Sequence, residues 1–286
     1  MPPHSLTFEA IGTHWQIDTA EPLPAALVTA LNTRIDRFDR DWSRFRADSL
    51  VARISAEPGR WTLPDDAGLL FELYRALYEA TDGAVSPLIG RSLEHLGYDQ
   101  AYSLRPAGRG IPAPHWSDAI AWDGTHLTTL RPVTLDIGAA GKGYLVDIVS
   151  GMLRSAGFRD HVIDASGDLR HRGAGSIRVA LEHPLDPTKA IGVVTLAGRA
   201  LCASASNRRA WGDGLHHILD ATTGQPTRSV IATWVVADDA LIADGLATAL
   251  FFRDADRFRE FDFEHARLFA DGRVEFSPGL TEEVFV

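Results

Sequence analysis

Residues 134–147 read TLDIGAAGKGYLVD, and this stretch decides how the fold is interpreted. Thr134–Ile137 is a short strand-like run, and a helical pattern follows from about Lys142 to Ala156, where Gly157 would end it. The small residues between the two runs let the backbone approach a ligand closely, and the free N–H groups of a helix N-terminus bind anions. The stretch therefore predicts a strand, a glycine-rich loop and a helix, which form either a tight turn or a phosphate site.

The lysine in this loop favours the phosphate interpretation. Lys142 and Lys189 are the only lysines among 28 Lys+Arg residues, and only Lys142 stands in a glycine-rich loop. An ammonium group is a compact point charge that fits a narrow phosphate pocket. The loop is not a Walker A motif, because Gly143 follows Lys142 where that motif has Ser or Thr, and no G-x-G-x-x-G dinucleotide motif is present. We therefore predict a diphosphate site at Lys142.

A second group of polar residues lies in residues 237–251, ADDALIADGLATALF. Asp244 and Thr248 are spaced i, i+4, so on a helix the carboxylate and the hydroxyl would share one face, about 6 Å apart. Two oxygen donors suit a hard cation such as Mg²⁺, which leaves its other positions to substrate phosphates. The alternative is that Asp244 is solvated and Thr248 bonds its own helix backbone. Because the rest of the helix is rich in Ala and Leu and should be buried, the carboxylate needs a partner.

The third group lies in residues 215–224, LHHILDATTG. Alternation along a strand would point His216 and His217 to opposite sides, so the pair cannot easily chelate one metal ion. A lone histidine near a turn is often structural, but a neutral imidazole is also the commonest general base near pH 7. We expect Asp220 to accept hydrogen bonds from the backbone of the turn at Thr222–Gly224.

The remaining pattern predicts an α+β fold in which the helices are segregated from an antiparallel sheet. Apolar residues at helical spacing predict one helix from Leu23 to about Ser43. A second helix, capped by Asp65 and ended near Gly83, should turn its leucines inward. Those leucines are Leu69, Leu70, Leu73 and Leu77.

Short β-like runs, separated by turns rich in Gly, Pro and Asp, predict antiparallel strands, because so few intervening residues leave no room for a crossover. The runs are His161–Ala165, Ile177–His183, Ile191–Leu196, Ala200–Ala205 and Ser229–Ala237. A helix is expected over Asp239–Phe251, and Asp271-Gly272 should close a terminal hairpin. Since no internal repeat or convincing linker interrupts the chain, residues 1–286 are expected to form a single domain.

The composition argues against several classes of protein. A formal net charge of −10 opposes the electrostatic attraction that nucleic-acid binders use. No stretch of roughly 18 apolar residues occurs, so membrane insertion is not expected. The first residues lack the pattern of a signal peptide, and the expected location is the cytoplasm. The single cysteine, Cys202, excludes an internal disulfide and suits a small buried hydrophobic residue.

Several stretches of the chain stand in a recognisable order. They are Gly12-Thr13, Trp42–Leu50 (WSRFRADSL), Thr81–Tyr98 (TDGAVSPLIGRSLEHLGY), Thr134–Asp147, Asp164–Leu169, His216–Pro226 (HHILDATTGQP) and Ala240–Phe251. Two patterns are intact, D-x-G-x-x-x-K-G from Asp136 and H-I-x-D-x-x-T-G from His217. In this order the stretches resemble the ApbE family of FAD:protein FMN transferases across nearly the whole chain.

The resemblance implies an ApbE-like, T-fold-like architecture and a particular site. Mg²⁺ would be held by the backbone carbonyl of Ala139 together with Asp244 and Thr248. Lys142 would contact FAD, and His217 would lie near the reacting phosphate, which makes these two the expected catalytic residues. The other expected contacts of FAD are Ser43, Ala84, Val85, Ser86, Asp136 and Ile218.

The resemblance also implies a reaction, in which FMN passes from FAD to a Thr or Ser hydroxyl of an acceptor flavoprotein and AMP is released. Mg²⁺ would be the cofactor, FAD the substrate, and a homodimer is one expected assembly. Two alternatives stay open. An FAD pyrophosphatase would use water as the nucleophile at the same site, giving FMN and AMP. A non-enzymatic flavin-binding protein would fit the departures at Val85 and Ser86, where the family usually has Phe and Asp.

Overall fold

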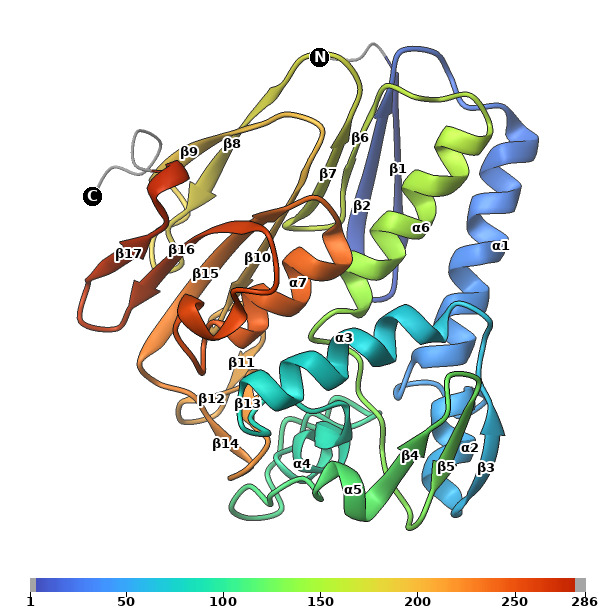
Figure 1. The fold of residues 1–286 in the computed structure, drawn as a ribbon, viewed down its shortest axis with the longest axis vertical. Coiled ribbons are helices and arrows are strands. Elements are labelled where there is room, and N and C mark those ends of the chain that lie inside the picture. The colour runs from blue at the N-terminus through green and yellow to red at the C-terminus, as the bar shows by residue number, and fades with distance from the viewer. Residues whose placement is uncertain (1–3, 281–286) are drawn as a thin grey trace.

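The computed structural model describes residues 4–280, and its largest sheet has eight strands (Figure 1). The strand order is β1-β2-β6-β7-β10-β15-β16-β17, and every neighbouring pair is antiparallel. The strands are β1 (His4–Ala10), β2 (Thr13–Thr19), β6 (His161–Asp164), β7 (Asp168–Arg172), β10 (Ala200–Ala205), β15 (Val230–Ala237), β16 (Phe263–Phe269) and β17 (Val274–Phe276). The predicted class, helices combined with an antiparallel sheet, is confirmed.

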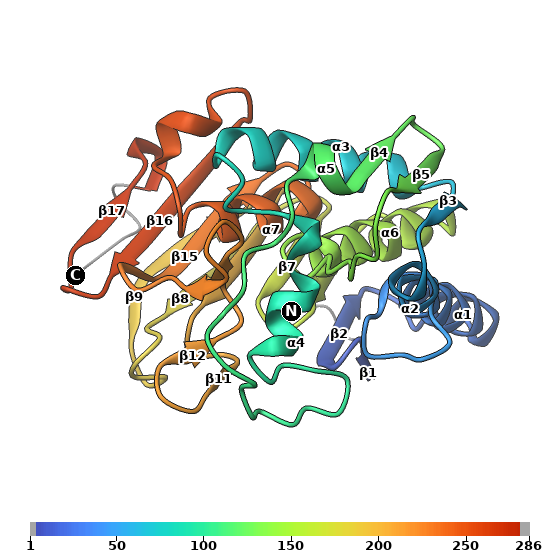
Figure 2. The ribbon, with the colours of Figure 1, turned by 90° about the horizontal axis from the view of Figure 1, so that it is seen from below.

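Helices α6 and α7 lie side by side against the middle of this sheet, and α1 and α3 pack beside them (Figure 1 and Figure 2). The edge strands β1 and β17 lie on opposite sides of the molecule in both views. Within residues 4–280, no helix is both long and apolar enough to span a membrane. The helices are α1 (Ala25–Trp42), α2 (Leu50–Ala56), α3 (Ala67–Ala80), α4 (Gly90–His95), α5 (Trp116–Ala119), α6 (Gly141–Ser155) and α7 (Ala240–Ala249), with 3₁₀ turns at Pro87–Ile89, Ala255–Phe258 and Pro278–Leu280.

Four smaller sheets surround the central one. Three strands pair in the order β3-β5-β4, and the pairs β8-β9, β11-β12 and β13-β14 form separate ladders. Their bounds are β3 (Gly59–Thr62), β4 (Ile120–Trp122), β5 (His126–Thr129), β8 (Ile177–Glu182), β9 (Ala190–Leu196), β11 (Ala210–Trp211), β12 (Leu215–His216), β13 (Leu219–Asp220) and β14 (Gln225–Pro226). Residues 215–220, which run from β12 to β13 in the two shortest ladders, are called the histidine segment below because they contain His216 and His217.

Most elements form where the pattern predicts them. Helix α1 buries most of the predicted apolar face, namely Leu31, Ile35, Phe38 and Trp42. Leu27 is half-buried, and Leu23 lies before the helix, which begins at Ala25. Gly157 follows Ala156, the C-cap residue of α6, with a φ of 94°, and Gly272 turns β16 into β17 with a φ of 87°. Both glycines adopt the left-handed conformation, which costs glycine little because it has no Cβ. The predicted ends of these two elements are therefore confirmed.

The strand predicted over Thr134–Ile137 is wrong. These residues belong to no strand, and the backbone N–H of Asp136 donates to the carbonyl of Pro87 at 2.8 Å. This bond joins the segment to the 3₁₀ turn at Pro87–Ile89 instead of to a strand of the sheet.

Two details predicted for α3 are also wrong. Leu69 does not point inward, because 60% of its surface is exposed. Asp65 does not cap the helix, which begins at Ala67 after Asp66. The Asp66 side chain makes no capping bond either, because it pairs with Arg34 on α1. An ion pair between helices has replaced the local cap that the sequence alone suggested.

Helices α6 and α7 touch at Gly143. A Cβ built on Gly143 would lie 2.1 Å from the carbonyl oxygen of Ala240 and 2.7 Å from the Cβ of Asp244. The backbone N–H of Gly143 donates to Oδ2 of Asp244 at 2.9 Å. Close approach of the two helices therefore needs glycine at this position, and it brings the glycine-rich loop to the acidic residue of α7.

Replacing Gly143 by alanine should force the helices apart and lower the free energy of unfolding by about 3 kcal/mol, the upper end for overpacking. Gly151 in the same helix is the matched control, because nothing lies within 4 Å of a Cβ built there. The change Gly151→Ala should raise stability by about 1 kcal/mol through helix propensity. Chemical denaturation measures both, and equal effects of the two variants would contradict the packing argument.

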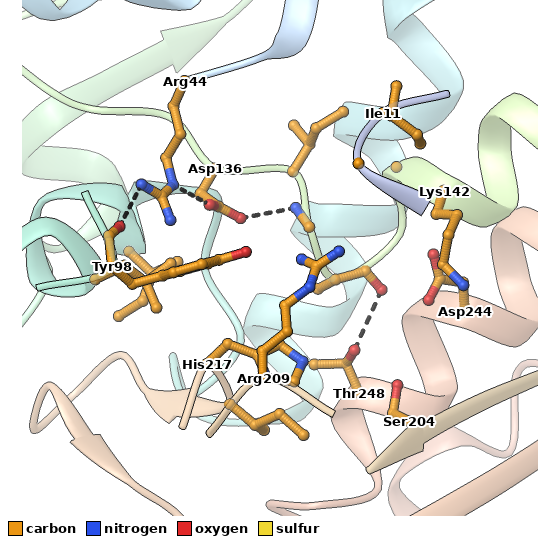
Figure 3. Close-up of a pocket in the computed structure, with 18 of the residues that line it drawn as sticks. Ile11, Arg44, Tyr98, Asp136, Lys142, Ser204, Arg209, His217, Asp244 and Thr248 are labelled. Carbon is orange, nitrogen blue, oxygen red and sulfur yellow. Dashed lines mark hydrogen bonds and ion pairs between the residues drawn. The ribbon is translucent and has the colours of Figure 1, made fainter. Parts of the chain in front are cut away.

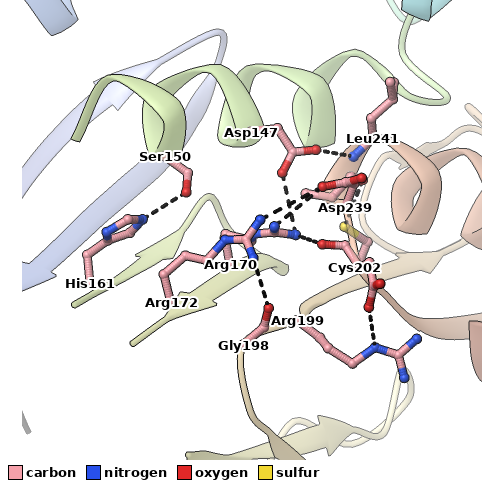
Figure 4. A network of polar contacts seen from close by, with 12 residues as sticks. Asp147, Ser150, His161, Arg170, Arg172, Gly198, Arg199, Cys202, Asp239 and Leu241 are labelled. Carbon is pink, nitrogen blue, oxygen red and sulfur yellow. Dashed lines mark hydrogen bonds and ion pairs between the residues drawn. The ribbon is translucent and has the colours of Figure 1, made fainter. Parts of the chain in front are cut away.

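A buried polar network fixes the N-terminus of α7 (Figure 4). Asp147 on α6 accepts a hydrogen bond from the backbone N–H of Leu241 at 2.8 Å, in the first turn of α7. Arg170 on β7 is fully buried and lies 3.4 Å from Asp239 and 3.7 Å from Asp147. Burial raises the pKa of Asp147 to about 7. The network holds the start of the helix that carries Asp244.

Candidate active site

A cavity of about 870 Å³ lies where α6, α7 and the histidine segment meet, and Figure 3 shows part of its lining. Pockets of about 300–1,000 Å³ are typical of small-molecule sites. All eleven residues predicted for the site line this cavity, although they come from separate parts of the chain. They are Ser43, Ala84, Val85, Ser86, Asp136, Ala139, Lys142, His217, Ile218, Asp244 and Thr248.

Oxygen donors gather where the loop before α6 meets α7. The Thr248 hydroxyl donates to the carbonyl of Ala139 at 3.3 Å, and Asp244 is only 5% exposed. Burial and the nearby charge of Asp168 raise the pKa of Asp244 well above its usual range. Within residues 4–280, its one hydrogen bond comes from the backbone of Gly143. A buried carboxylate with so little compensation is favourable only with a cation or a proton.

The chemistry of these donors fits a hard divalent cation. No group of three or more His, Cys, Asp or Glu side chains in the described part of the chain is arranged to hold a metal ion. A cation here would use one carboxylate, the Thr248 hydroxyl, the Ala139 carbonyl and oxygen atoms from a ligand. This is the pattern that Mg²⁺ prefers, because it commonly binds one or two carboxylates plus substrate phosphates.

The ammonium of Lys142 is turned toward the turn after β6. Its Nζ donates to the carbonyls of Ala165 at 2.8 Å and Ser166 at 3.3 Å, and lies 3.1 Å from Oδ2 of the fully buried Asp168. Burial lowers the pKa of Lys142, but the charges of Asp168 and Asp244 outweigh it and raise the pKa overall. Two of the three ammonium donors thus have carbonyl partners, and the contact with Asp168 is an ion pair.

Asp136 is bound on both sides of its carboxylate. Oδ1 accepts the backbone N–H of Gly138 at 2.7 Å, which shapes the glycine-rich loop, and Oδ2 accepts Nε of Arg44 at 2.6 Å (Figure 3). Arg44 is itself buried and donates to the carbonyl of Tyr98 at 2.6 Å. Its guanidinium also lies 4.1 Å from the ring centroid of Phe45. Asp136 therefore ties the loop to the neighbouring wall of the cavity.

That wall is aromatic. Tyr98 stacks on Trp211 with ring centroids 5.6 Å apart, and Phe45 stacks on Tyr102 at 4.9 Å. Phe45, Tyr98 and Tyr102 all line the cavity. Aromatic side chains offer large flat surfaces on which a planar ring can stack. The cavity thus combines an aromatic wall with a charged end around Lys142 and Asp244.

His217 lies in the cavity, whereas His216 points away from it. Nε2 of His216 bonds the carbonyl of Thr227 at 2.8 Å, as expected from alternation along the chain. Nδ1 of His217 is buried and has no hydrogen-bond partner within residues 4–280. Burial lowers the pKa of His217 to about 3, and the positive charge of Arg209 adds to the effect. The predicted turn bond from Thr222 to Asp220 is present at 2.8 Å.

The lowered pKa of His217 has a consequence for stability. In the unfolded chain His217 binds a proton near pH 6.5, whereas in the folded chain it does so only near pH 3. The free energy of unfolding therefore decreases as pH falls below 6.5. Between pH 8 and pH 5 the protonation of His217 in the unfolded chain should lower the free energy of unfolding by about 2 kcal/mol. In His217→Gln the loss of unfolding free energy over that range should be smaller by that amount. Denaturation at both pH values measures it, and an unchanged difference would contradict a neutral buried imidazole.

Some residues of the site were not assigned a role from the sequence. Arg44, Tyr98 and Asp168 lie in stretches that carry the family resemblance, but no role was predicted for them. Arg209 lies outside those stretches, yet it also lines the cavity. The pairing of Arg44 with Asp136 spans 92 positions. No local spacing could have revealed it.

The fold and the cavity together define a mixed α+β protein with a large cavity between its helices and loops. The chain belongs to the ApbE family, because the model of that family matches residues 11–267. Two solved structures have the same fold. The ApbE protein of Thermotoga maritima MSB8 gives a TM-score of 0.84 at 24% identity and 98% coverage of both chains. The flavin transferase ApbE of Vibrio cholerae gives 0.80 at 20% identity, covering 98% of this chain and 99% of that chain.

Curated relatives carry the name FAD:protein FMN transferase, which is a transferase activity. The protein from Rhodobacter capsulatus is 29% identical over 273 residues, and the match covers 87% of this chain. This chain spans about half of that relative, 51% of its length. The protein from Treponema pallidum (strain Nichols) is 28% identical, with 96% of this chain and 87% of the relative covered.

Proposed function

We propose that this chain is an FAD:protein FMN transferase that moves FMN from FAD to a Thr or Ser hydroxyl of an acceptor protein. The activity is the one that the names of the Rhodobacter and Treponema relatives give. The observation that carries the proposal is that the glycine-rich loop, helix α7 and the histidine segment line one cavity. In this proposal, residues 1–286 act as one flavin transferase domain.

FAD would lie along the cavity. A planar ring of the dinucleotide would face the aromatic wall formed by Phe45 and Tyr98, where stacking is favourable. The diphosphate would lie at the charged end, near Lys142. The other proposed contacts are Asp136 and the residues around Ser43, Ala84, Val85, Ser86 and Ile218, which line the same cavity. Val85 and Ser86 are both buried, and Ser86 caps the 3₁₀ turn after it, so their departures from the family pattern have a structural use.

Ala139, Asp244 and Thr248 would hold Mg²⁺. When bound, the ion would neutralise negative charge on the diphosphate oxygens. The protein's own contribution is to keep the donors in place, through the Gly143 bond to Asp244 and the Thr248 bond to Ala139. Prearranged groups of this kind stabilise the transition state without reorganising during the reaction.

His217 would accept the proton of the acceptor hydroxyl while that oxygen attacks the phosphorus on the FMN side of FAD. The bond from this phosphorus to the bridging oxygen breaks, and its electron pair leaves with AMP. The neutral imidazole and the unpartnered Nδ1 support this role. A pKa of about 3 is low for a base. A bound diphosphate adds negative charge near the imidazole, which favours its protonated form and raises the pKa.

The test is intact-mass analysis of an acceptor protein after incubation with this chain, FAD and Mg²⁺. Transfer raises the mass of the acceptor by one FMN unit. One molecule of AMP is released for each acceptor that is modified. Free FMN with AMP and an unmodified acceptor would show a pyrophosphatase instead. Binding of FAD without AMP would show a non-enzymatic flavin-binding protein. An acceptor whose target hydroxyl residue is replaced by alanine is the control and should stay unmodified.

Three further points stay predictions. They are the Thr or Ser residue as the modified position, the cytoplasmic location and a homodimer. Site-resolved peptide mass analysis tests the first, fractionation of cells the second and light scattering the third. Neither the location nor the homodimer is needed for the site to work as proposed.

A further inference from the structure

Arg209 differs from the other cationic residues around the cavity. It directly precedes β11, its side chain is exposed to the cavity, and Figure 3 shows its guanidinium extending into the space between the walls. Within residues 4–280 its side chain makes no ion pair or hydrogen bond. A guanidinium group has five N–H donors in a flat fork and stays charged at all ordinary pH values. Here that fork faces open space.

Every other Arg or Lys that lines the cavity is neutralised by a carboxylate in the described part of the chain. Arg44 pairs with Asp136 at 2.6 Å and Lys142 with Asp168 at 3.1 Å. Arg208, the neighbour of Arg209, pairs with Glu182 at 2.9 Å. Arg46 pairs with Asp39 at 3.0 Å, as well as with other carboxylates of its own region. Arg209 is therefore the uncompensated positive charge of the cavity wall.

The charge of Arg209 acts on residues from three walls of the cavity. It adds to burial in lowering the pKa of His217, and it partly opposes the rise in the pKa of Tyr98 and of Asp244 that burial causes. Tyr98 belongs to the aromatic wall and Asp244 to α7, so the guanidinium reaches the centre of the cavity. Figure 3 agrees, because Arg209 is drawn between Tyr98, His217 and Thr248. A ligand that spans the cavity must pass this group.

We propose that Arg209 binds the diphosphate of FAD from the side opposite Asp244 and Thr248. The inference rests on the proposed function for the identity of the ligand. A diphosphate presents several oxygen atoms that a guanidinium can bind in a bidentate manner, and such bonds are stronger than those between neutral groups. The ammonium of Lys142 is already engaged, since it donates to two carbonyls and forms an ion pair with Asp168. The guanidinium of Arg209 has no such partners within residues 4–280.

The experiment compares Arg209→Gln and Arg209→Lys with the control Arg208→Gln, which removes an equivalent side chain next to it. Dissociation constants are measured with Mg²⁺ present for three probes: FAD, ADP, which has the diphosphate without the flavin, and riboflavin, which has the flavin without phosphate. Calorimetry and flavin fluorescence give the values. Thermal unfolding confirms that each variant is folded.

Arg209→Gln should weaken the binding of FAD and of ADP to the same degree, about 10- to 100-fold, and leave the binding of riboflavin unchanged. Arg209→Lys should recover part of the loss, because it restores the charge but not the fork. Arg208→Gln should bind all three probes as the wild type does. If Arg209→Gln weakens the binding of riboflavin instead of the binding of ADP, the side chain contacts the flavin ring and the proposal is wrong. Equal losses in the Arg208 and Arg209 variants would also overturn it, because they would show only a general charge effect.

These outcomes are separate from the proposed reaction. If the wild type fails to modify any acceptor but shows the expected losses with FAD and ADP, the transferase proposal fails and the role of Arg209 stands. If transfer occurs but Arg209→Gln binds ADP normally, the role of Arg209 fails and the transferase proposal stands. The steady-state constants add a third measurement. If Arg209 keeps its contact with the diphosphate through the reaction, Arg209→Gln should raise KM for FAD more than it lowers kcat.

Discussion

Replacing Asp244 by asparagine is expected to abolish FMN transfer while leaving the metal-free protein at least as stable as the wild type. The proposed cation would lose its one carboxylate, and a loss of about 1,000-fold in rate corresponds to about 4 kcal/mol of transition-state stabilisation. Stability should not fall, because Asp244 is a buried carboxylate beside Asp168 and asparagine removes the cost of burying its charge. The amide oxygen can still accept the bond from Gly143.

The measurement is thermal unfolding with and without Mg²⁺, together with the transfer assay. Mg²⁺ should stabilise the wild type, by about 2.7 kcal/mol at a concentration of 100 Kd, and should not stabilise Asp244→Asn. Asp147→Asn is the matched control. Asp147 is also a buried carboxylate next to α7, but it lies outside the cavity and bonds Leu241. Because Asp147 also faces the buried guanidinium of Arg170 at 3.7 Å, its variant should lose stability yet keep the response to Mg²⁺. A normal Mg²⁺ response in Asp244→Asn would rule out this metal site.

Replacing Lys142 by methionine is expected to lower both transfer and stability. The change leaves Asp168 fully buried without its cation, and breaking a buried ion pair in this way typically costs about 3–5 kcal/mol. The turn that contains Ala165 and Ser166 would also lose its contacts with the ammonium group. Transfer should fall by about 100-fold or more, because a charged group and the order of this turn are lost together.

The double variant Lys142→Met with Asp168→Asn separates the two effects. Removing both charges should restore most of the stability, since no uncompensated charge stays buried. It should not restore transfer, because the positive charge near the diphosphate is still absent. Denaturation and the transfer assay together measure this. Recovery of transfer in the double variant would show that Lys142 serves only to neutralise Asp168.

The local pattern predicted the parts of the site that lie within one element. The i, i+4 spacing of Asp244 and Thr248 and the glycine-rich loop at Lys142 needed no knowledge of the fold. The hairpin of β1 and β2 was not predicted from the sequence. Its turn has Ile11 at a φ of 45° and Gly12 at 76°, whereas Asn-Gly is the usual signal for such a turn. A β-branched residue in this conformation is unusual, so the sequence points away from it.

Taken alone, the sequence determined which faces of the helices are apolar, where glycine ends them and which oxygen and nitrogen donors are available. These properties follow from spacing along one element, and the printed order of residues contains that spacing. Only the tertiary structure decided that Asp168 neutralises Lys142, that Arg44 holds Asp136 and that the Arg209 side chain has no ion-pair partner within residues 4–280. Those pairings join segments that are far apart in the chain. They depend on the strand order of the sheet and on the close contact of α6 with α7 at Gly143, which residue spacing within any one segment does not encode.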